Sequence, residues 1–360
     1  MRPNNNKPLK ITSLQVFRAL AAIVVVLFHI TIYAQEKLKH AFIGGAFSFG
    51  HTGVDFFFVL SGFIIFYAHH DVFGDRSQLR SYAFKRFIRI FPIYWIVTLT
   101  KLAVLLAVPA VAKSYERDPA VIVKSLLLIP QINLPIIGAA WTLSYELLFY
   151  FLFAVALWAG GKWAVRFMLA WCIAILGFFI LKAGSFITTY SYLVDFFLNE
   201  RNLEFLLGCA AAYLMLNQKI RLPAIWVLAG IAGWVLSGWF VNNNGAVPAY
   251  TLLFGIPSFL LIAGMSAIES VRKVKWPNLF VFLGDASYSI YLTHAVFVNI
   301  FSMVMQRMGV FALWANLALA VMAVFAVAGG SAVYYFIERP LLHSLRKAGS
   351  YVAPRAAVKT

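Results

Sequence analysis

Charge and cysteine are both scarce in this chain of 360 residues. Only 12% of the residues are charged and 62% are hydrophobic, which lies far from the composition of a soluble globular domain. The two cysteines, Cys172 and Cys209, both lie within apolar runs. They indicate neither a disulfide framework nor a metal site, and we assign them to packing. This composition excludes a soluble domain and is typical of a protein with many membrane spans.

Acidic residues are scarcer still than basic ones. The chain has 13 Asp and Glu against 30 Lys and Arg, for a net charge of +17. Such a charge can indicate nucleic-acid binding, but the sequence has no compact basic domain that would bind DNA or RNA. Membrane topology explains the excess better, because Lys and Arg accumulate in cytoplasmic loops. We therefore expect membrane lipids, and no nucleic acid, as partners.

Apolar stretches near the length that crosses a bilayer occur ten times. They lie at about 11–33, 52–69, 91–111, 141–159, 164–182, 203–217, 224–241, 248–266, 288–305 and 311–336, and the sixth is short. An even number of spans places both termini on one side of the membrane. The larger share of Lys and Arg lies on that side, which predicts cytoplasmic termini. The sequence therefore predicts an all-α polytopic membrane protein with about ten transmembrane helices.

No linker, composition shift or internal repeat divides the chain. We expect a single integral-membrane domain over 1–346 and a frayed cytoplasmic tail over 347–360, where the residues are small or polar. The first apolar run is too long for the core of a signal peptide and no convincing cleavage site follows. It is therefore expected to stay as the first span.

Two ionisable residues, Arg18 and His29, interrupt that first span. Ionisable side chains at membrane depth are costly and usually functional. Their spacing of eleven residues corresponds to about three helical turns, which places both on one face, roughly 16 Å apart along the axis. In the alternative, Arg18 reaches the lipid headgroups and His29 bonds a neighbouring helix.

The second span carries small residues and one carboxylate. Gly53, Ser61 and Gly62 would allow a close approach of another helix. Asp55 lies near the outer end, where His29 of the first span also lies. It can accept a hydrogen bond from the His29 ring and fix its tautomer, or it can cap the helix N-terminus.

A basic cluster precedes the third span. Arg86 and Arg89 are three residues apart, so on a helix they face the same way and can grip a phosphate group. Positive-inside anchoring predicts the same charges. Pro92 is expected to start or kink the helix that follows.

The fourth span begins with an aromatic and acidic group. Trp141, Glu146 and Tyr150 cluster there, and the last two are four residues apart on one helical face. Trp and Tyr alone would indicate an interfacial belt, but Glu146 lies inside the span without an adjacent cation, which favours a functional or pore-facing role. Ser61 and Ser144 have no glycine elbow or adjacent base, so we expect them to pack.

The last two spans contain further candidates. His294 and Tyr291 lie on adjacent turns about a third of the way in from the cytoplasmic face, where they can line a cavity or bond a neighbouring helix. Glu338 and Arg339 are expected at the cytoplasmic interface as anchors, with Pro340 closing the final helix.

Taken in order, these motifs resemble the acyltransferase-3 family of integral-membrane acyltransferases. The resemblance covers almost the whole chain. It rests on Arg18 and His29, GVDFFFVLSGF at 53–63, KRFIRIFPIYW at 85–95, WTLSYELLFY at 141–150, SYSIYLTHAVF at 287–297 and FIERP at 336–340. Each piece alone is weak, and the order and spacing make the set specific.

The resemblance implies an enzyme that takes an acyl group, usually acetyl, from acyl-coenzyme A on the cytoplasmic side and delivers it to an outward-facing hydroxyl. His29 matches the essential histidine of the family, and Arg18, Arg86 and Arg89 match residues linked to coenzyme binding. Neutral His29 would act as general base, or an acyl-His29 intermediate would form. Asp55 or Glu146 would orient His29 or bind the sugar, and no metal is implied.

The acceptor and location follow only by analogy. An exopolysaccharide, a lipid-linked sugar or another envelope glycan is expected, with a small-molecule or antibiotic hydroxyl as the alternative. Some family members carry an additional outer esterase-like domain, whereas this chain is expected to be a stand-alone enzyme of a bacterial inner membrane. A proton-coupled transporter that uses His29, Asp55, Glu146 and His294 is the competing hypothesis.

Overall fold

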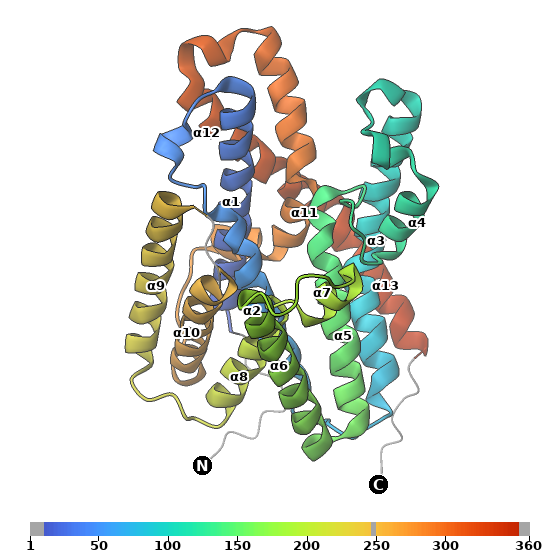
Figure 1. Cartoon of the computed structure of the whole chain (residues 1–360), viewed down its shortest axis with the longest axis vertical. Helices are drawn as coiled ribbons and strands as arrows, with labels where there is room; N and C mark the ends of the chain where they lie inside the picture. Colours follow the sequence, from blue (N-terminus) through green and yellow to red (C-terminus); the bar gives the residue numbers. More distant parts are fainter. Residues whose placement is uncertain (1–10, 246–249, 353–360) are drawn as a thin grey trace.

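The computed structural model describes residues 11–245 and 250–352, and this part of the chain is built from helices joined by short turns. Its α-helices are α1 (Ser13–Tyr33), α2 (Gly53–His69), α3 (Gln78–Ala107), α4 (Pro119–Leu127), α5 (Trp141–Ala159), α6 (Gly161–Ala183), α7 (Tyr192–Leu198), α8 (Asn202–Leu216), α9 (Pro223–Asn244), α10 (Tyr250–Val271), α11 (Asn278–Arg307), α12 (Val310–Val333) and α13 (Arg339–Val352). Figure 1 shows the long helices running along the long axis of the molecule.

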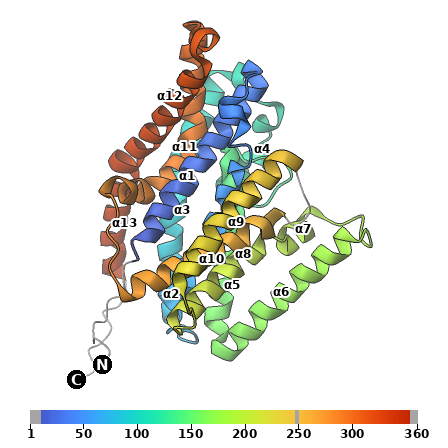
Figure 2. The same ribbon diagram turned by 90° about the vertical axis from the view of Figure 1, so that its left-hand side faces the viewer.

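Nine helical segments of the described ranges are long and apolar enough to cross a membrane. This confirms the prediction of an all-α polytopic membrane protein. The sixth predicted span corresponds to α8, which has only 15 residues, yet α8 packs closely against α2 and α10. The beginning of α1 and the end of α13 lie in the same half of the molecule (Figure 2).

The first helix, α1, lies in the interior of the bundle. It packs against α11 and α12 on one side and against α2 and α10 on the other, an arrangement that Figure 2 shows from the side. Most buried apolar residues of α1 belong to two clusters: Leu14 and Phe17 join α2, α8 and α10, and Val26 and Ile30 join α11 and α12. The span that carries Arg18 and His29 is thus in contact with both groups of helices.

Two glycines bring α2 and α8 into backbone contact. A Cβ on Gly62 would lie 2.0 Å from the carbonyl oxygen of Phe205, and one on Gly208 would lie 1.9 Å from that of Val59. No side chain fits at either position. The predicted role of Gly62 in close helix approach is therefore confirmed.

The third span begins earlier than the hydropathy indicates. The helix α3 starts at Gln78, so Arg86 and Arg89 are helical and Pro92 lies inside the helix. Of the two predicted roles of Pro92, starting the span is wrong, and a kink stays a prediction. The basic cluster is on a helix as expected. Lys and Arg lower the hydropathy of a segment but are good helix formers, which explains why the apolar window missed these residues.

The end of the last span also differs from the prediction. The chain passes through a π-helical turn, Tyr334–Glu338, and continues as α13, so Pro340 does not close the helix. It occupies the first turn of α13, where a missing N–H needs no partner. Residues 347–352 of the expected tail are consequently helical. The other expected tail residues, 353–360, and the N-terminal residues 1–10 of the predicted domain lie outside the described ranges.

The segment between α3 and α5 folds back onto the bundle, and α4 lies beside one end of α3 (Figure 1). The hydroxyl of Tyr94 donates to the carbonyl oxygen of Ser125 over 2.5 Å, and the indole of Trp95 donates to that of Leu126 over 2.9 Å. Lys101 forms an ion pair with the buried Glu116 at 2.7 Å. These contacts fix the segment that leads into α5.

Candidate active site

A basic cavity of about 150 Å³ lies where α1, α2, α3, α5 and α11 meet. Its polar and charged lining residues are Arg18, Ser61, Arg86, Arg89, Thr142, Glu146, Tyr150, Ser287, Tyr288 and Tyr291. The structure thus brings together all three arginines that the family resemblance links to coenzyme binding. It places Glu146 and Tyr150 in the same cavity.

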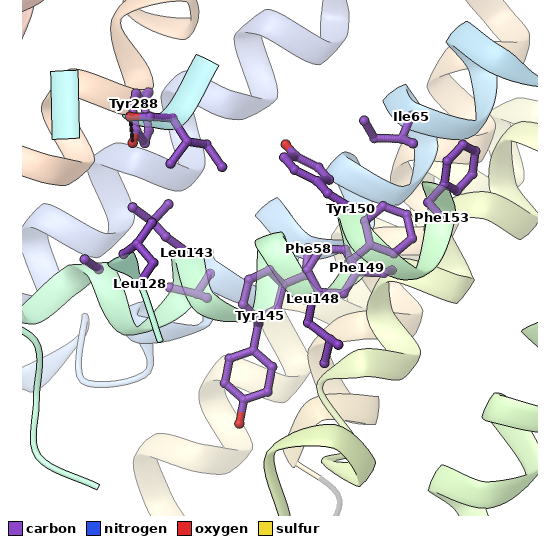
Figure 3. Packing of buried hydrophobic residues seen from close by; sticks show 14 of the residues in the cluster. Phe58, Ile65, Leu128, Leu143, Tyr145, Leu148, Phe149, Tyr150, Phe153 and Tyr288 are labelled. Atoms are coloured by element: carbon purple, nitrogen blue, oxygen red, sulfur yellow. Dashed lines mark hydrogen bonds between the residues drawn. The ribbon is translucent and has the colours of Figure 1, made fainter. Parts of the chain in front are cut away.

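The carboxylate of the cavity, Glu146, is held by two hydroxyl groups. Tyr150 lies one turn along α5 and donates a hydrogen bond to Glu146, and Ser61 of α2 donates to the same oxygen over 3.3 Å. Figure 3 shows the Tyr150 ring beside the packed rings of Phe149 and Phe153, with Tyr288 on a different helix. The aromatic packing of α5 therefore fixes the side of the helix that carries Glu146.

Arg89 is held in place by an ion pair with a residue that does not line the cavity. Its Nη1 lies 2.7 Å from Oε1 of Glu338, which is fully buried, and Ser289 donates to the other oxygen of Glu338 over 2.6 Å. The guanidinium lies over the ring of Tyr288, 5.0 Å from its centroid. The prediction that Glu338 is an interfacial anchor is therefore wrong. The π-helical turn, Tyr334–Glu338, ends with this residue inside the bundle.

Arg18 and Arg86 have no such partner. Within the described ranges neither forms an ion pair. Arg18 donates through Nε to Ser287 over 3.1 Å, and Arg86 lies over the faces of Tyr82 and Tyr150. The Nε atom of Arg86 is buried without a hydrogen-bond partner in that part of the chain. Two guanidinium groups with unused donors form a binding site for an anion such as a phosphate.

His29 lies outside the cavity, in contact with a second histidine. The ring centroids of His29 and His294 are 4.7 Å apart. His29 is exposed although it lies within the first span, whereas His294 is fully buried. The helix α11 begins ten residues before the predicted span, so His294 lies near its middle. The structure thus brings together two histidines that the sequence places on separate spans.

Tyr291 connects this histidine pair with the cavity. Its side chain lines the cavity, and its carbonyl oxygen lies 2.6 Å from Nδ1 of His294. The Tyr291 hydroxyl donates to the carbonyl oxygen of Ala139. One turn of α11 therefore contacts both the basic cavity and the histidine pair.

Asp55 and Trp141 lie in neither the cavity nor the histidine pair. The carboxyl of Asp55 is buried against that of Glu204 in α8, with Arg201 as the neighbouring cation. Among the described residues Asp55 makes no hydrogen bond to His29. The guanidinium of Arg201 lies over the ring of Trp141, 5.2 Å from its centroid.

Five polar or charged residues of the cavity region were missed by the sequence-based prediction: Ser61, Thr142, Ser287, Tyr288 and Glu338. Ser61 was assigned to packing and Glu338 to the interface. The sequence does contain a signal for Glu338. Like Glu146, it is an acidic residue in or at the end of an apolar run, where placing a charge costs free energy. Nothing in the sequence distinguishes Ser61 and Ser287 from ordinary packing residues. In the described ranges no group of three or more His, Cys, Asp or Glu is arranged to hold a metal ion.

The structure is thus that of a polytopic membrane protein with a cavity lined by three arginines. A family model described as an acyltransferase domain matches residues 11–336, which is most of the chain. The protein belongs to this acyltransferase family. Membership favours acyl transfer over the competing hypothesis of a proton-coupled transporter.

Two relatives cover nearly the whole chain. The exopolysaccharide production protein ExoZ of Rhizobium meliloti (strain 1021) is 31% identical over 348 residues, which are 92% of this chain and 99% of that protein. The acyltransferase MdmB of Streptomyces mycarofaciens is 25% identical over 365 residues, which are 93% of this chain and 92% of that protein. No solved structure matches this chain.

Proposed function

We propose that this protein transfers an acyl group, in the first place acetyl, from cytoplasmic acyl-coenzyme A to a hydroxyl of an extracytoplasmic carbohydrate. The observation that carries the proposal is the basic cavity, in which Arg18 and Arg86 have no carboxylate partner in the described ranges. An acyl-coenzyme A brings several phosphate groups, and its thioester is the natural acyl source for this enzyme family.

In the proposed donor complex, the arginines bind phosphate groups. Arg86 supplies a guanidinium group that lines the cavity without a carboxylate partner in the described ranges, and Arg18 supplies the terminal nitrogens that its bond to Ser287 leaves free. The cavity is smaller than the roughly 300–1,000 Å³ of a typical ligand pocket. It therefore takes only a phosphate-bearing part of the coenzyme, while the adenosine remains at the cavity mouth. The pantetheine arm extends along the face of α1 that carries His29.

Acyl transfer requires a base at the acceptor hydroxyl. In the proposed reaction, neutral His29 takes the hydroxyl proton while the oxygen attacks the thioester carbonyl. A C–O ester bond forms, the C–S bond breaks, and the proton passes from His29 to the leaving thiolate to give free coenzyme A. The exposure of His29 supports this role, because the acceptor must reach it.

The similarity to an exopolysaccharide production protein supports a glycan acceptor. We propose an exopolysaccharide unit or lipid-linked sugar on the outer side of a bacterial inner membrane. Both termini are then cytoplasmic, in agreement with the excess of Lys and Arg near the chain ends and in alternate connections. The basic cavity receives Arg18 and Arg86 from the first halves of α1 and α3.

The direct test is a transfer assay with the purified protein in liposomes. Radiolabelled acetyl-coenzyme A and an exopolysaccharide repeat unit are supplied, and thiol release and labelled glycan are measured. We expect His29→Ala to lose transfer while it still binds the coenzyme. The matched control is His70→Ala, since His70 is exposed and bonds only the carbonyl of its own helical turn, that of Tyr67.

Absence of both coenzyme binding and thiol release in the wild-type protein would overturn the proposal. Rapid quenching distinguishes the two chemical routes. Labelled protein that is absent in His29→Ala would replace direct transfer with an acyl-His29 intermediate.

A further inference from the structure

A fully buried histidine, His294, has one ring nitrogen without a partner. Its Nδ1 lies 2.6 Å from the carbonyl oxygen of Tyr291, whereas its Nε2 is buried and makes no hydrogen bond within the described ranges. A carbonyl oxygen only accepts hydrogen bonds, so Nδ1 must carry the proton and Nε2 must present a lone pair. A buried acceptor left unsatisfied costs about 1–3 kcal/mol, so this arrangement calls for a functional reason.

The ionisable ring in contact with His294 is that of His29. The two rings are tilted by 41° with centroids 4.7 Å apart, and this separation allows an N–H···N bond after a rotation of the exposed His29 ring. Neither ring nitrogen of His29 has a hydrogen bond in the described part of the chain. Its other ring contact is Phe28, which offers no acceptor. His294 is thus the acceptor available to His29.

Within the described ranges no carboxylate forms a hydrogen bond or an ion pair with His29. The titratable and charged groups that face it are His294 of α11, His51 in the turn before α2, and Arg201, which lies near His51. The carboxyl group of Asp55, which the sequence suggested as a partner of His29, instead contacts that of Glu204. A base that becomes cationic in these surroundings needs a strong neutral acceptor.

We propose that His294 is a positioning residue for His29. Its Nε2 accepts a hydrogen bond from the His29 ring while His29 holds the proton taken from the substrate hydroxyl. This inference rests on the proposed function. Tyr291 locks the tautomer of His294, so the His29 nitrogen that faces His294 carries a proton and the other nitrogen is free to act as the base. His294 keeps its own protonation state throughout, and the transferred proton passes from the acceptor hydroxyl to His29 and then to the thiolate.

The test compares two substitutions at His294 in the full-length protein in liposomes. His294→Phe keeps a ring of similar size without a lone pair, and His294→Gln keeps an acceptor. We expect His294→Phe to lower kcat by about 10- to 100-fold, the value of a hydrogen bond to a charged group, with unchanged coenzyme binding. We expect His294→Gln to restore part of kcat.

The pH profile separates positioning from packing. Without the acceptor, protonated His29 is less stable, so the acid limb of the kcat profile should move to lower pH in His294→Phe and less far in His294→Gln. The matched control is Val296→Ala, at an exposed position of the same helix. It should leave kcat and the acid limb of the pH profile unchanged. Coenzyme binding shows whether each variant is folded. If His294→Phe does not bind the coenzyme, His294→Met takes its place in the comparison.

Two results would overturn the inference while leaving the proposed function intact. One is a wild-type kcat and pH profile in His294→Phe. The other is an equal loss in His294→Phe and His294→Gln with the acid limb in place, which would assign His294 to packing. Failure of the proposed function is distinguishable, because the wild-type protein itself would then transfer nothing.

Discussion

The three arginines of the cavity differ in how the protein holds them. Arg89 is neutralised by the fully buried Glu338, and Arg18 is bonded to Ser287. Arg86 is supported only by the faces of two tyrosine rings and has a free Nε. The residue with the fewest protein partners has the most donors left for a ligand, so Arg86 should contribute most to phosphate binding.

Replacing Arg86 with alanine should therefore weaken coenzyme A binding by about 10- to 100-fold, the loss of a charge-assisted hydrogen bond. Isothermal titration of the detergent-purified protein measures this directly. Lys85→Ala is the control, because Lys85 is the exposed neighbour on the same helix. Equal affinities for Arg86→Ala and Lys85→Ala would remove Arg86 from the donor site.

Glu338 has a structural role that its charge alone does not reveal. Glu338→Ala leaves Arg89 without its counterion, and breaking such a pair by removing one partner costs about 3–5 kcal/mol. We expect a clear fall in the thermal unfolding temperature. Glu338→Gln keeps the hydrogen bond from Ser289, so its unfolding temperature should fall less. A Glu338→Ala protein that unfolds at the wild-type temperature would contradict this account.

Much of the site was predictable from the sequence, because several of its residues are spaced three or four positions apart on a single helix. Arg86 with Arg89, and Glu146 with Tyr150, are neighbours on single helices, so helical periodicity alone places each pair on one face. The partners of these residues come from distant parts of the chain, and Glu338 lies 249 positions after Arg89. No spacing rule predicts such a pairing, so Glu338 was misassigned.

At the scale of the helices, the contact between α2 and α8 controls the position of the second span. The backbones touch at Gly62 and Gly208, and α2 also lines the basic cavity through Ser61. A change in this contact should therefore affect both stability and donor binding. The sequence predicted most helices by their apolar length, but it missed the starts of α3 and α11, where polar residues interrupt the apolar window.

Gly208→Val should separate α2 from α8, since its side chain would meet the carbonyl oxygen of Val59. Overpacking of this kind costs about 1–3 kcal/mol, and we expect a lower unfolding temperature together with weaker coenzyme binding. Gly177→Ala is the control, because a Cβ there meets nothing within 4 Å. Tolerance of valine at Gly208 would show that the two helices do not pack this closely.

The segment between α3 and α5 has its own pH dependence. Burial by itself raises the pKa of Glu116, but the ion pair with Lys101 and hydrogen bonds at Lys113 outweigh it and hold the pKa below its ordinary value. A lowered native pKa gives stability that is present above the unfolded value of about 4.3 and is lost as the pH falls through the native pKa.

Amide protection in Ser114–Arg117 should therefore decrease at acidic pH, after correction for the intrinsic exchange rate. Glu116→Gln should show the reduced protection already at neutral pH. Hydrogen exchange followed by mass spectrometry measures both. Protection that is the same in the wild-type and Glu116→Gln proteins at neutral pH would contradict the role of the ion pair.

For the whole molecule, the helices run back and forth along one axis, and the described chain ends lie in the same half (Figure 2). Lys37 lies in the connection after α1, and Lys273 lies in the connection after α10. If the termini are cytoplasmic as proposed, Lys37 is outside the cell membrane and Lys273 is inside. The single-domain organisation stays a prediction, which rests on the absence of a linker in the apolar pattern.

Cysteine labelling of intact bacterial spheroplasts tests this orientation. In a background with Cys172→Ser and Cys209→Ala, a membrane-impermeant maleimide should label Lys37→Cys in closed spheroplasts. It should label Lys273→Cys only after lysis. Both positions are exposed, so accessibility in the protein does not limit the reaction. The reverse pattern would invert the topology and place the basic cavity entrance outside.

The ion pair between Arg89 and Glu338 also orders the events of synthesis. Arg89 enters the membrane with α3 when the last part of the chain is still on the ribosome, since the two residues are 249 positions apart. Until α12 and the turn after it are inserted, Arg89 lacks the carboxylate of Glu338. The basic cavity then lacks the ion pair that holds Arg89 in place. A nascent chain that stops before α12 therefore holds an unpaired cation at membrane depth. Membrane quality control can recognise such a chain, so only a fully translated protein should accumulate.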